Sequence, residues 1–174
     1  MSDTSLRITE IFHSLQGETS TTGLPTVFVR LTGCPLRCSY CDTAYAFEGG
    51  HKVALSEIVA TVGSYGANYV TVTGGEPLAQ PECIELLRQL CDLGYRVSLE
   101  TSGAMPVQMV DSRVVKIVDL KTPGSGEVTR NLYENIECLL PHDEVKFVIC
   151  NRQDYDWCCL KIDELRLRDK VTEI

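Results

Sequence analysis

The sequence has no hydrophobic run long enough to cross a membrane, because no segment approaches the roughly 18 consecutive apolar residues of a transmembrane helix. Its opening stretch, MSDTSLRITE, also lacks the basic segment followed by an apolar run that marks a secretory signal. Positive charge is scarce, since 16 Lys and Arg stand against 24 Asp and Glu for a formal net charge of −8. Because the basic residues are also scattered, these absences predict a cytoplasmic protein that binds neither a membrane nor nucleic acid.

Internal repeats, low-complexity tracts and linkers are also absent from the 174 residues. Hydrophobic residues make up 44% of the chain, enough for one continuous core, so we expect a single domain over residues 1–174. The nine cysteines are an odd number in a chain that can build a core without crosslinks, which argues against a disulfide framework. We therefore expect free thiols or metal ligands.

The order of apolar patterns indicates the fold class. Short β-branched runs alternate with longer helix-like stretches, which predicts a parallel α/β sheet with right-handed crossovers covered by helices. A complete eight-fold barrel needs about 250 residues, so we expect a partial, open (β/α) barrel of five to six parallel strands. Residues 171–174 look like the opening of a sixth strand, so the C-terminal element of the barrel is expected to be missing. The expected strands are 26–32, 69–73, 95–101, 114–120 and 145–150, the expected helices are 54–65, 81–93, 132–140 and 155–167, and the loop 122–127 is expected to be mobile.

Polar side chains recur where the predicted strands finish. Arg30 alternates with the apolar residues of its strand, and polar residues follow the later strands at 73–76, 100–102 and 119–121. The carboxyl ends of parallel strands converge on one mouth, where ligands bind. Four polar strand ends therefore predict one site.

Three cysteines follow the first of these strands closely, in the segment GCPLRCSYCDT. Cys34, Cys38 and Cys41 are spaced to bind one face of a [4Fe–4S] cluster, and three thiolates would leave one iron free for a small molecule. The competing interpretation is a structural zinc site in which His51 is the fourth ligand.

Two motifs connect the chain to a known superfamily. CPLRCSYC resembles the cysteine signature of radical S-adenosylmethionine (radical SAM) enzymes, and TGGEP resembles their second, glycine-rich motif. The segments SLQGE, FVRLTGC, CDT, ETSG and DLKTPGSGE narrow the resemblance to the 7-carboxy-7-deazaguanine synthase family, from about Ile8 to the last residue.

The resemblance implies a reaction, cofactors and partners. The reaction is conversion of 6-carboxy-5,6,7,8-tetrahydropterin to 7-carboxy-7-deazaguanine with loss of ammonia, in the formation of a queuosine precursor. It implies a [4Fe–4S] cluster, S-adenosylmethionine and Mg2+ as cofactors, a small-molecule pterin substrate, a reducing electron donor such as flavodoxin, and a homodimer. It assigns no catalytic side chain.

The resemblance also implies site residues. A guanidinium can form two hydrogen bonds to a carboxylate, which independently makes Arg30 the natural partner of the substrate carboxylate. The implied substrate-binding residues are Leu15, Gln16, Gly17, Arg30 and Thr73; those beside S-adenosylmethionine are Tyr40, Cys41, Asp42, Gly75, Ser102, Asp119, Leu120 and Lys121; the metal ligands are Cys34, Cys38 and Cys41 for the cluster and Thr43 for Mg2+.

The sequence alone leaves other roles open for two of these residues and other functions open for the chain. Arg30 would otherwise form a salt bridge with Glu100 or Glu76, and Lys121 would otherwise be a solvated loop charge. The runner-up enzyme is a glycyl-radical-enzyme activase, which has the same cysteine spacing. A metal-binding module without catalytic activity belongs to a different class.

Overall fold

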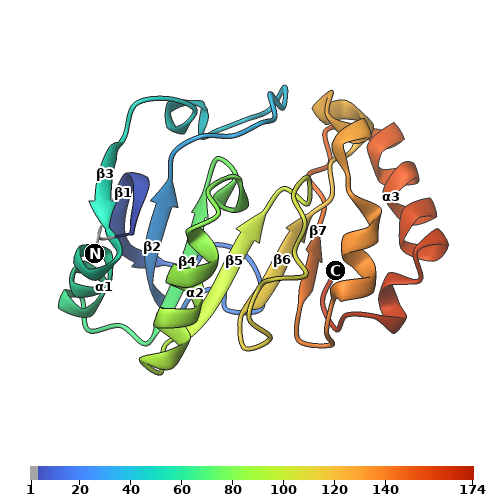
Figure 1. Cartoon of the computed structure of the whole chain (residues 1–174). Coiled ribbons are helices and arrows are strands. Elements are labelled where there is room, and N and C mark those ends of the chain that lie inside the picture. Colours follow the sequence, from blue (N-terminus) through green and yellow to red (C-terminus); the bar gives the residue numbers. More distant parts are fainter. Residues whose placement is uncertain (1–3) are drawn as a thin grey trace.

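Residues 4–174 are described by the computed structural model, in which one sheet carries all the strands of this part of the chain (Figure 1). The strand order is β3-β1-β2-β4-β5-β6-β7. The strands are β1 (Ser5–Leu15), β2 (Pro25–Leu31), β3 (His51–Ala54), β4 (Tyr69–Gly74), β5 (Arg96–Thr101), β6 (Val115–Asp119) and β7 (Glu144–Lys146). The α-helices are α1 (Leu55–Ser64), α2 (Cys83–Asp92) and α3 (Arg152–Glu164), and the 3-10 helices are η1 (Ala44–Ala46), η2 (Pro77–Ala79), η3 (Pro123–Ser125), η4 (Val128–Arg130), η5 (Tyr133–Cys138) and η6 (Leu167–Asp169).

The sheet is mostly parallel, which confirms the predicted α/β class. Strands β2, β4, β5, β6 and β7 pair parallel with one another in that order. Strand β1 pairs antiparallel with both β2 and β3, and neither β1 nor β3 was predicted. Strand β1 is largely exposed or half-buried and β3 has four residues, so neither carries the buried β-branched run by which the other strands were found.

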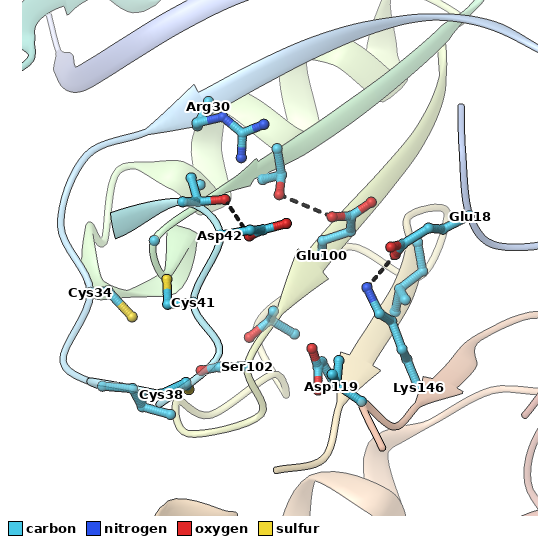
Figure 2. Close-up of a pocket in the computed structure, with 18 of the residues that line it drawn as sticks. Glu18, Arg30, Cys34, Cys38, Cys41, Asp42, Glu100, Ser102, Asp119 and Lys146 are labelled. Carbon is cyan, nitrogen blue, oxygen red and sulfur yellow. Dashed lines mark hydrogen bonds and ion pairs between the residues drawn. The ribbon is translucent and has the colours of Figure 1, made fainter. Parts of the chain in front are cut away.

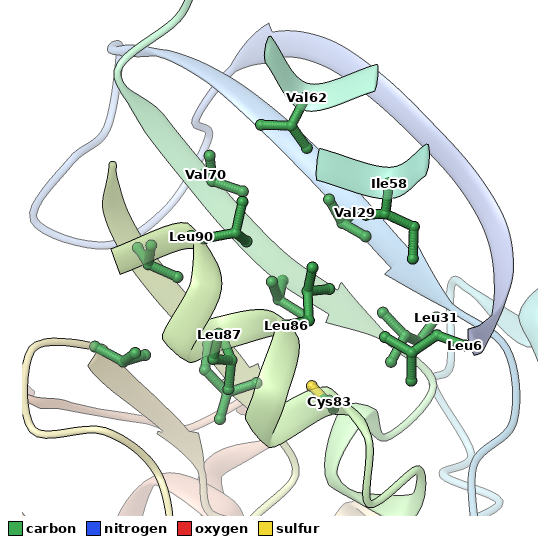
Figure 3. Packing of buried hydrophobic residues seen from close by; sticks show 14 of the residues in the cluster. Leu6, Val29, Leu31, Ile58, Val62, Val70, Cys83, Leu86, Leu87 and Leu90 are labelled. Carbon is green, nitrogen blue, oxygen red and sulfur yellow. The ribbon is translucent and has the colours of Figure 1, made fainter. Parts of the chain in front are cut away.

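The main core lies between the sheet and helices α1 and α2 (Figure 3). Alternate residues of β2 are fully buried on this face, and a stripe of α2 packs towards them. That stripe follows the i, i+3, i+4, i+7 spacing of an amphipathic helix. It consists of Cys83, Leu86, Leu87 and Leu90, and the strand residues are Val27, Val29 and Leu31.

A second, smaller core joins β6 and β7 to the C-terminal part of the chain. Beside it, Lys116 and Asp143 form a fully buried ion pair with 2.8 Å between Nζ and Oδ2. The same carboxylate accepts hydrogen bonds from the backbone N–H groups of Lys116 and Leu140. These two further hydrogen bonds help to offset the cost of burying the carboxylate, so the pair and its backbone contacts fix the approach to β7 against β6.

Three sequence predictions on the C-terminal side were wrong in detail. The segment predicted as a helix over 132–140 forms the shorter 3-10 helix η5, Tyr133–Cys138, in which the buried amide of Asn135 binds the backbone of residues 103, 105 and 107. Strand β7 ends at Lys146 and not at 150, because its partner β6 ends at the paired Asp119. Helix α3 begins at Arg152, three residues before the predicted start, because the side chain of Asn151 caps it.

The loop 122–127, expected to be mobile, is instead packed into the structure. Thr122 and Ser125 are fully buried, and the Ser125 hydroxyl donates a hydrogen bond of 2.6 Å to the Thr122 carbonyl. Residues 171–174 contribute one parallel bridge, between Glu173 and Glu144. In residues 4–174, no helix has the length and apolar character needed to span a membrane.

Candidate active site

A cavity of about 500 Å³ opens on the face of the sheet opposite α1 and α2, a size typical of small-molecule sites. Its wall is formed in part by strand residues whose side chains alternate with those of the core and so point to the opposite face. In register, Arg30 of β2 lies beside Thr73 of β4, and Asp119 of β6 lies beside Lys146 of β7. The predicted convergence of polar strand ends is therefore present.

The three clustered cysteines line one end of this cavity, on the loop after β2 (Figure 2). All three are partly exposed free thiols. The loop is pinned at its start by the hydrogen bond from Gly33 N–H to the Ala46 carbonyl, 2.8 Å, and closed by that from Cys41 N–H to the Cys38 carbonyl, 3.2 Å. Burial raises the pKa of the Cys34 and Cys38 thiols.

The TGGEP turn packs directly on the beginning of the cysteine loop. Glu76 N–H donates to the Gly33 carbonyl at 2.8 Å. A Cβ atom on Gly75 would lie 2.2 Å from that carbonyl oxygen and 2.8 Å from Cys34 Cβ, which no side chain tolerates. Glycine at 75 is thus required for the two motifs to meet, and it leaves backbone exposed to the cavity.

Glu76, the acidic residue of the TGGEP motif, is fully buried. It accepts hydrogen bonds from the hydroxyls of Thr101 and Ser102 and from the N–H groups of Leu78 and Ser102, at 2.5–3.0 Å. These four donors replace the hydrogen bonds to water that the carboxylate loses on burial. Glu76 thereby fixes the end of β5, including Ser102 in the cavity wall.

Arg30 forms an ion pair with Glu10 of β1, with 2.8 Å between Nε and Oε1. The salt bridge to Glu100 or Glu76 that the sequence left open is therefore wrong, because β1, which was not predicted, supplies the partner. Tyr45 also donates to Glu10 Oε1 at 2.8 Å. Within residues 4–174, the guanidinium bonds to protein through Nε, and its side chain lines the cavity.

A second polar group lies at the end of the cavity away from the cysteines (Figure 2). Lys146 forms an ion pair with Glu18 of the β1–β2 connection. Glu100 accepts a 3.0 Å hydrogen bond from Thr73. Burial raises the pKa of Glu100, against the opposing effects of Lys146 and Thr73.

The raised pKa of Glu100 predicts a pH-dependent stability. An acid with a higher pKa in the folded state destabilises the fold as pH rises through that value, and the effect vanishes below its unfolded pKa of about 4.3. We therefore expect Glu100→Gln to raise the Tm of the apoprotein at neutral pH, by about 2–4 °C for each kcal/mol recovered, with the difference disappearing near pH 4. Thermal unfolding across pH, with the exposed Glu48→Gln as control, measures this. A lower Tm at every pH would instead show that the carboxylate's hydrogen bonds dominate.

Lys121 is buried in the cavity wall, so its interpretation as a solvated loop charge is wrong. Its Nζ lies 3.0 Å from Asp119 Oδ2 and 5.7 Å from the centre of the Tyr40 ring. The other oxygen, Asp119 Oδ1, is buried without a hydrogen-bond partner among residues 4–174. A buried acceptor without a partner fits a ligand that brings its own donors, such as an amino or ribose hydroxyl group.

Most of the site residues that the resemblance implied come together around this cavity, the exceptions being Leu15 and Leu120. The Leu15 side chain is 62% exposed at the end of β1. The Leu120 side chain alternates to the other face and lies in the smaller core. Those in the lining are Gln16, Gly17, Arg30, Cys34, Cys38, Tyr40, Cys41, Asp42, Thr43, Thr73, Gly75, Ser102, Asp119 and Lys121.

Sequence reasoning missed several lining residues, most of them apolar. Two carried a usable signal: Phe28 shares the strand face of Arg30, and Lys146 is a lone charge in an apolar strand pattern. The missed residues are Phe28, Leu36, Phe47, Ile117, Lys146 and Val148.

The donor set fits a cluster better than a single ion. In the part of the chain from residue 4 onward, no three His, Cys, Asp or Glu side chains converge on a single-ion site. Cluster thiolates belong to different irons and need only surround one face, whereas zinc needs its donors around one point. His51, the proposed fourth zinc ligand, is exposed in β3 and is not part of the lining.

Comparison with known proteins gives concordant results. The model of the radical SAM superfamily matches residues 28–120. The 7-carboxy-7-deazaguanine synthase of Koribacter versatilis is 47% identical over 171 residues, covering 97% of this chain and 76% of the relative. The synthase of Chlorobaculum tepidum is 46% identical, covering 87% of this chain and 70% of the relative. The crystal structure of QueE from Escherichia coli superimposes with a TM-score of 0.73 at 25% identity, over 92% of this chain and 77% of that one.

Proposed function

The chain belongs to the 7-carboxy-7-deazaguanine synthase family of the radical SAM superfamily, and from this we propose that it converts 6-carboxy-5,6,7,8-tetrahydropterin to 7-carboxy-7-deazaguanine with release of ammonia. The observation that carries the proposal is the set of residues that line one cavity. Three cysteine thiols line one end, and the guanidinium of Arg30 lies in the same lining. A metal-binding module without catalytic activity needs no such guanidinium. A glycyl-radical-enzyme activase acts on a protein, and the relatives reported above are named as synthases instead.

Superfamily membership implies a [4Fe–4S] cluster and S-adenosylmethionine, which together supply a radical able to abstract hydrogen. Cys34, Cys38 and Cys41 would hold the cluster. The exposed backbone at Gly75 and the unpartnered Asp119 Oδ1 suit the polar groups of S-adenosylmethionine. The remaining residues proposed to lie beside it are Tyr40, Asp42, Ser102 and Lys121, together with the backbone of Leu120, whose side chain lies in the smaller core.

At the substrate end, the protein would bind and orient. The guanidinium of Arg30 would hold the pterin carboxylate by two hydrogen bonds. The amide of Gln16, 4% exposed and 3.3 Å from the Thr71 hydroxyl, can both donate to and accept from a heterocycle edge. Leu15 and Gly17 would contribute backbone groups and Thr73 its hydroxyl.

We place Mg2+ at Thr43, whose hydroxyl donates a 2.8 Å hydrogen bond to Asp42 on the cavity wall. Mg2+ commonly takes one or two protein oxygens together with substrate and water, so this position suits an ion shared with the pterin carboxylate. An external reductant such as flavodoxin and a homodimeric assembly complete the proposal.

The test is product formation by the purified chain. After anaerobic reconstitution with iron and sulfide, incubation with S-adenosylmethionine, dithionite, Mg2+ and the carboxylated pterin is expected to give 7-carboxy-7-deazaguanine, identified by mass spectrometry. Omitting Mg2+ is expected to slow the reaction. Reconstituted protein that cleaves S-adenosylmethionine but never forms this product would contradict the assigned substrate, and protein that holds no cluster would contradict the whole proposal.

A further inference from the structure

Asp154 is a fully buried carboxylate in the first turn of α3, outside the cavity lining. Its Oδ1 accepts a 2.8 Å hydrogen bond from Gly124 N–H, and its Oδ2 accepts a 3.0 Å bond from Cys150 N–H. Burial raises the pKa of Asp154, but these bonds outweigh burial and hold it below its usual value. Asp154 is therefore ionised at neutral pH and uses its charge to hold backbone.

One of the two backbone groups that Asp154 holds, the N–H of Gly124, belongs to η3 in the packed loop after β6. A Cβ atom on Gly124 would lie 2.4 Å from Asp154 Oδ2, so the loop sits directly on the carboxylate. The hydroxyl of Thr122 donates to the Val148 carbonyl at 2.9 Å, which ties the same loop to the segment after β7. Asp154 thus sets the position of η3 relative to both β6 and α3.

The other side of η3 holds the cysteine loop. The Ser39 hydroxyl donates to the Gly124 carbonyl at 2.7 Å, and Ser39 N–H donates to the Ser125 carbonyl at 2.9 Å. Arg37 N–H donates to Glu127 Oε1 at 2.6 Å. Ser39 directly follows Cys38, so a displacement of η3 moves a cysteine of the cluster.

We propose that Asp154 is a positioning residue for the iron–sulfur cluster, acting through η3 and Ser39 on the loop that carries Cys38. The inference rests on the proposed function, because it needs the three cysteines to bind a cluster. Gly124 transmits the position by its two backbone groups: its N–H is held by Asp154 and its carbonyl by Ser39. Partners that orient metal ligands typically change metal affinity by about 10–100-fold when they are removed.

The experiment measures the rate at which reconstituted protein loses iron to a chelator. Asp154→Asn replaces one acceptor oxygen by a donor facing an N–H group, and is expected to accelerate iron loss at least about tenfold and to alter the EPR signal of the reduced cluster. Asp156→Asn is the matched control, because Asp156 lies on the same helix in an exposed pair with Arg152, and it is expected to leave the rate unchanged.

A second variant distinguishes an effect of Asp154 on the cluster from an effect on fold stability alone. Ser39 is exposed, so Ser39→Ala should fold normally and still accelerate iron loss by removing the contact with Gly124. If both residues act through η3, the double variant should lose iron no faster than the more affected single variant. Additive effects, or a lower apoprotein Tm with wild-type iron loss, would overturn the inference.

If Asp154→Asn does not fold, Ser39→Ala carries the test alone, and a wild-type rate of iron loss in it overturns the inference. Wild-type protein that holds no cluster refutes the proposed function itself, whereas variants that hold the cluster as firmly as wild type refute only the role of Asp154.

Discussion

Replacing Cys38 by alanine is expected to abolish both cluster assembly and product formation. Two thiolates cannot hold a cluster that three were arranged to bind, and without it no radical forms. The thiol is partly exposed in the cavity wall, so the free energy of unfolding of the apoprotein should change by no more than about 0.5 kcal/mol. The apoprotein Tm should therefore stay close to the wild-type value. Iron and sulfide analysis, EPR and mass spectrometry of the product measure the effect.

The matched control is Cys159→Ala, because Cys159 is an exposed thiol on α3 and is not part of the cavity lining. This variant should assemble the cluster and form product as wild type does. A Cys38→Ala protein with full iron content and activity would show that another group serves as the third ligand. Loss of iron in both variants would point to general thiol damage during reconstitution.

The polar strand residues of the lining were predictable because the face on which they lie depends on local periodicity. In a strand, side chains alternate between the two faces, so the core positions Val29 and Leu31 place Arg30 on the opposite face whatever the strand pairs with. The same two-residue period brings Thr73 and Glu100 into the cavity. The parallel order then aligns the ends of the strands, so short-range pattern accounts for these strand residues. The loop residues of the lining, such as Gln16 and Thr43, were indicated by the family resemblance instead.

The partners of these side chains were not predictable, because they depend on strand order and crossover paths. The ion pair of Arg30 joins residues 20 apart through the unpredicted antiparallel β1. Lys146 meets Glu18 across 128 residues, and Asp154 reaches Gly124 across 30. No periodicity within one segment encodes such contacts, so the sequence indicated where charges lie but not what neutralises them.

Replacing Arg30 by glutamine is expected to lower kcat/KM for the carboxylated pterin by about a hundredfold or more. Removing one member of a buried, hydrogen-bonded charge pair costs about 2–5 kcal/mol, and 1.4 kcal/mol is tenfold. Glu10 holds the guanidinium through Nε, so the group is oriented before the substrate binds. Arg30→Lys keeps the charge but loses the planar fork, so its kcat/KM should fall between the other two. Steady-state kinetics with all three proteins measure this.

The same variants separate carboxylate recognition from a merely structural role of Arg30. A tetrahydropterin without the 6-carboxylate should bind wild type and Arg30→Gln with equal affinity. Only wild type should bind the carboxylated pterin more tightly than the one without the carboxylate. Arg96→Gln is the control, because Arg96 is exposed at the start of β5 and is not part of the cavity lining. Cluster content should be the same in all of them. If Arg30→Gln instead weakens both pterins alike, the ion pair with Glu10 shapes the cavity without binding the carboxylate, and the substrate must be held elsewhere in the lining.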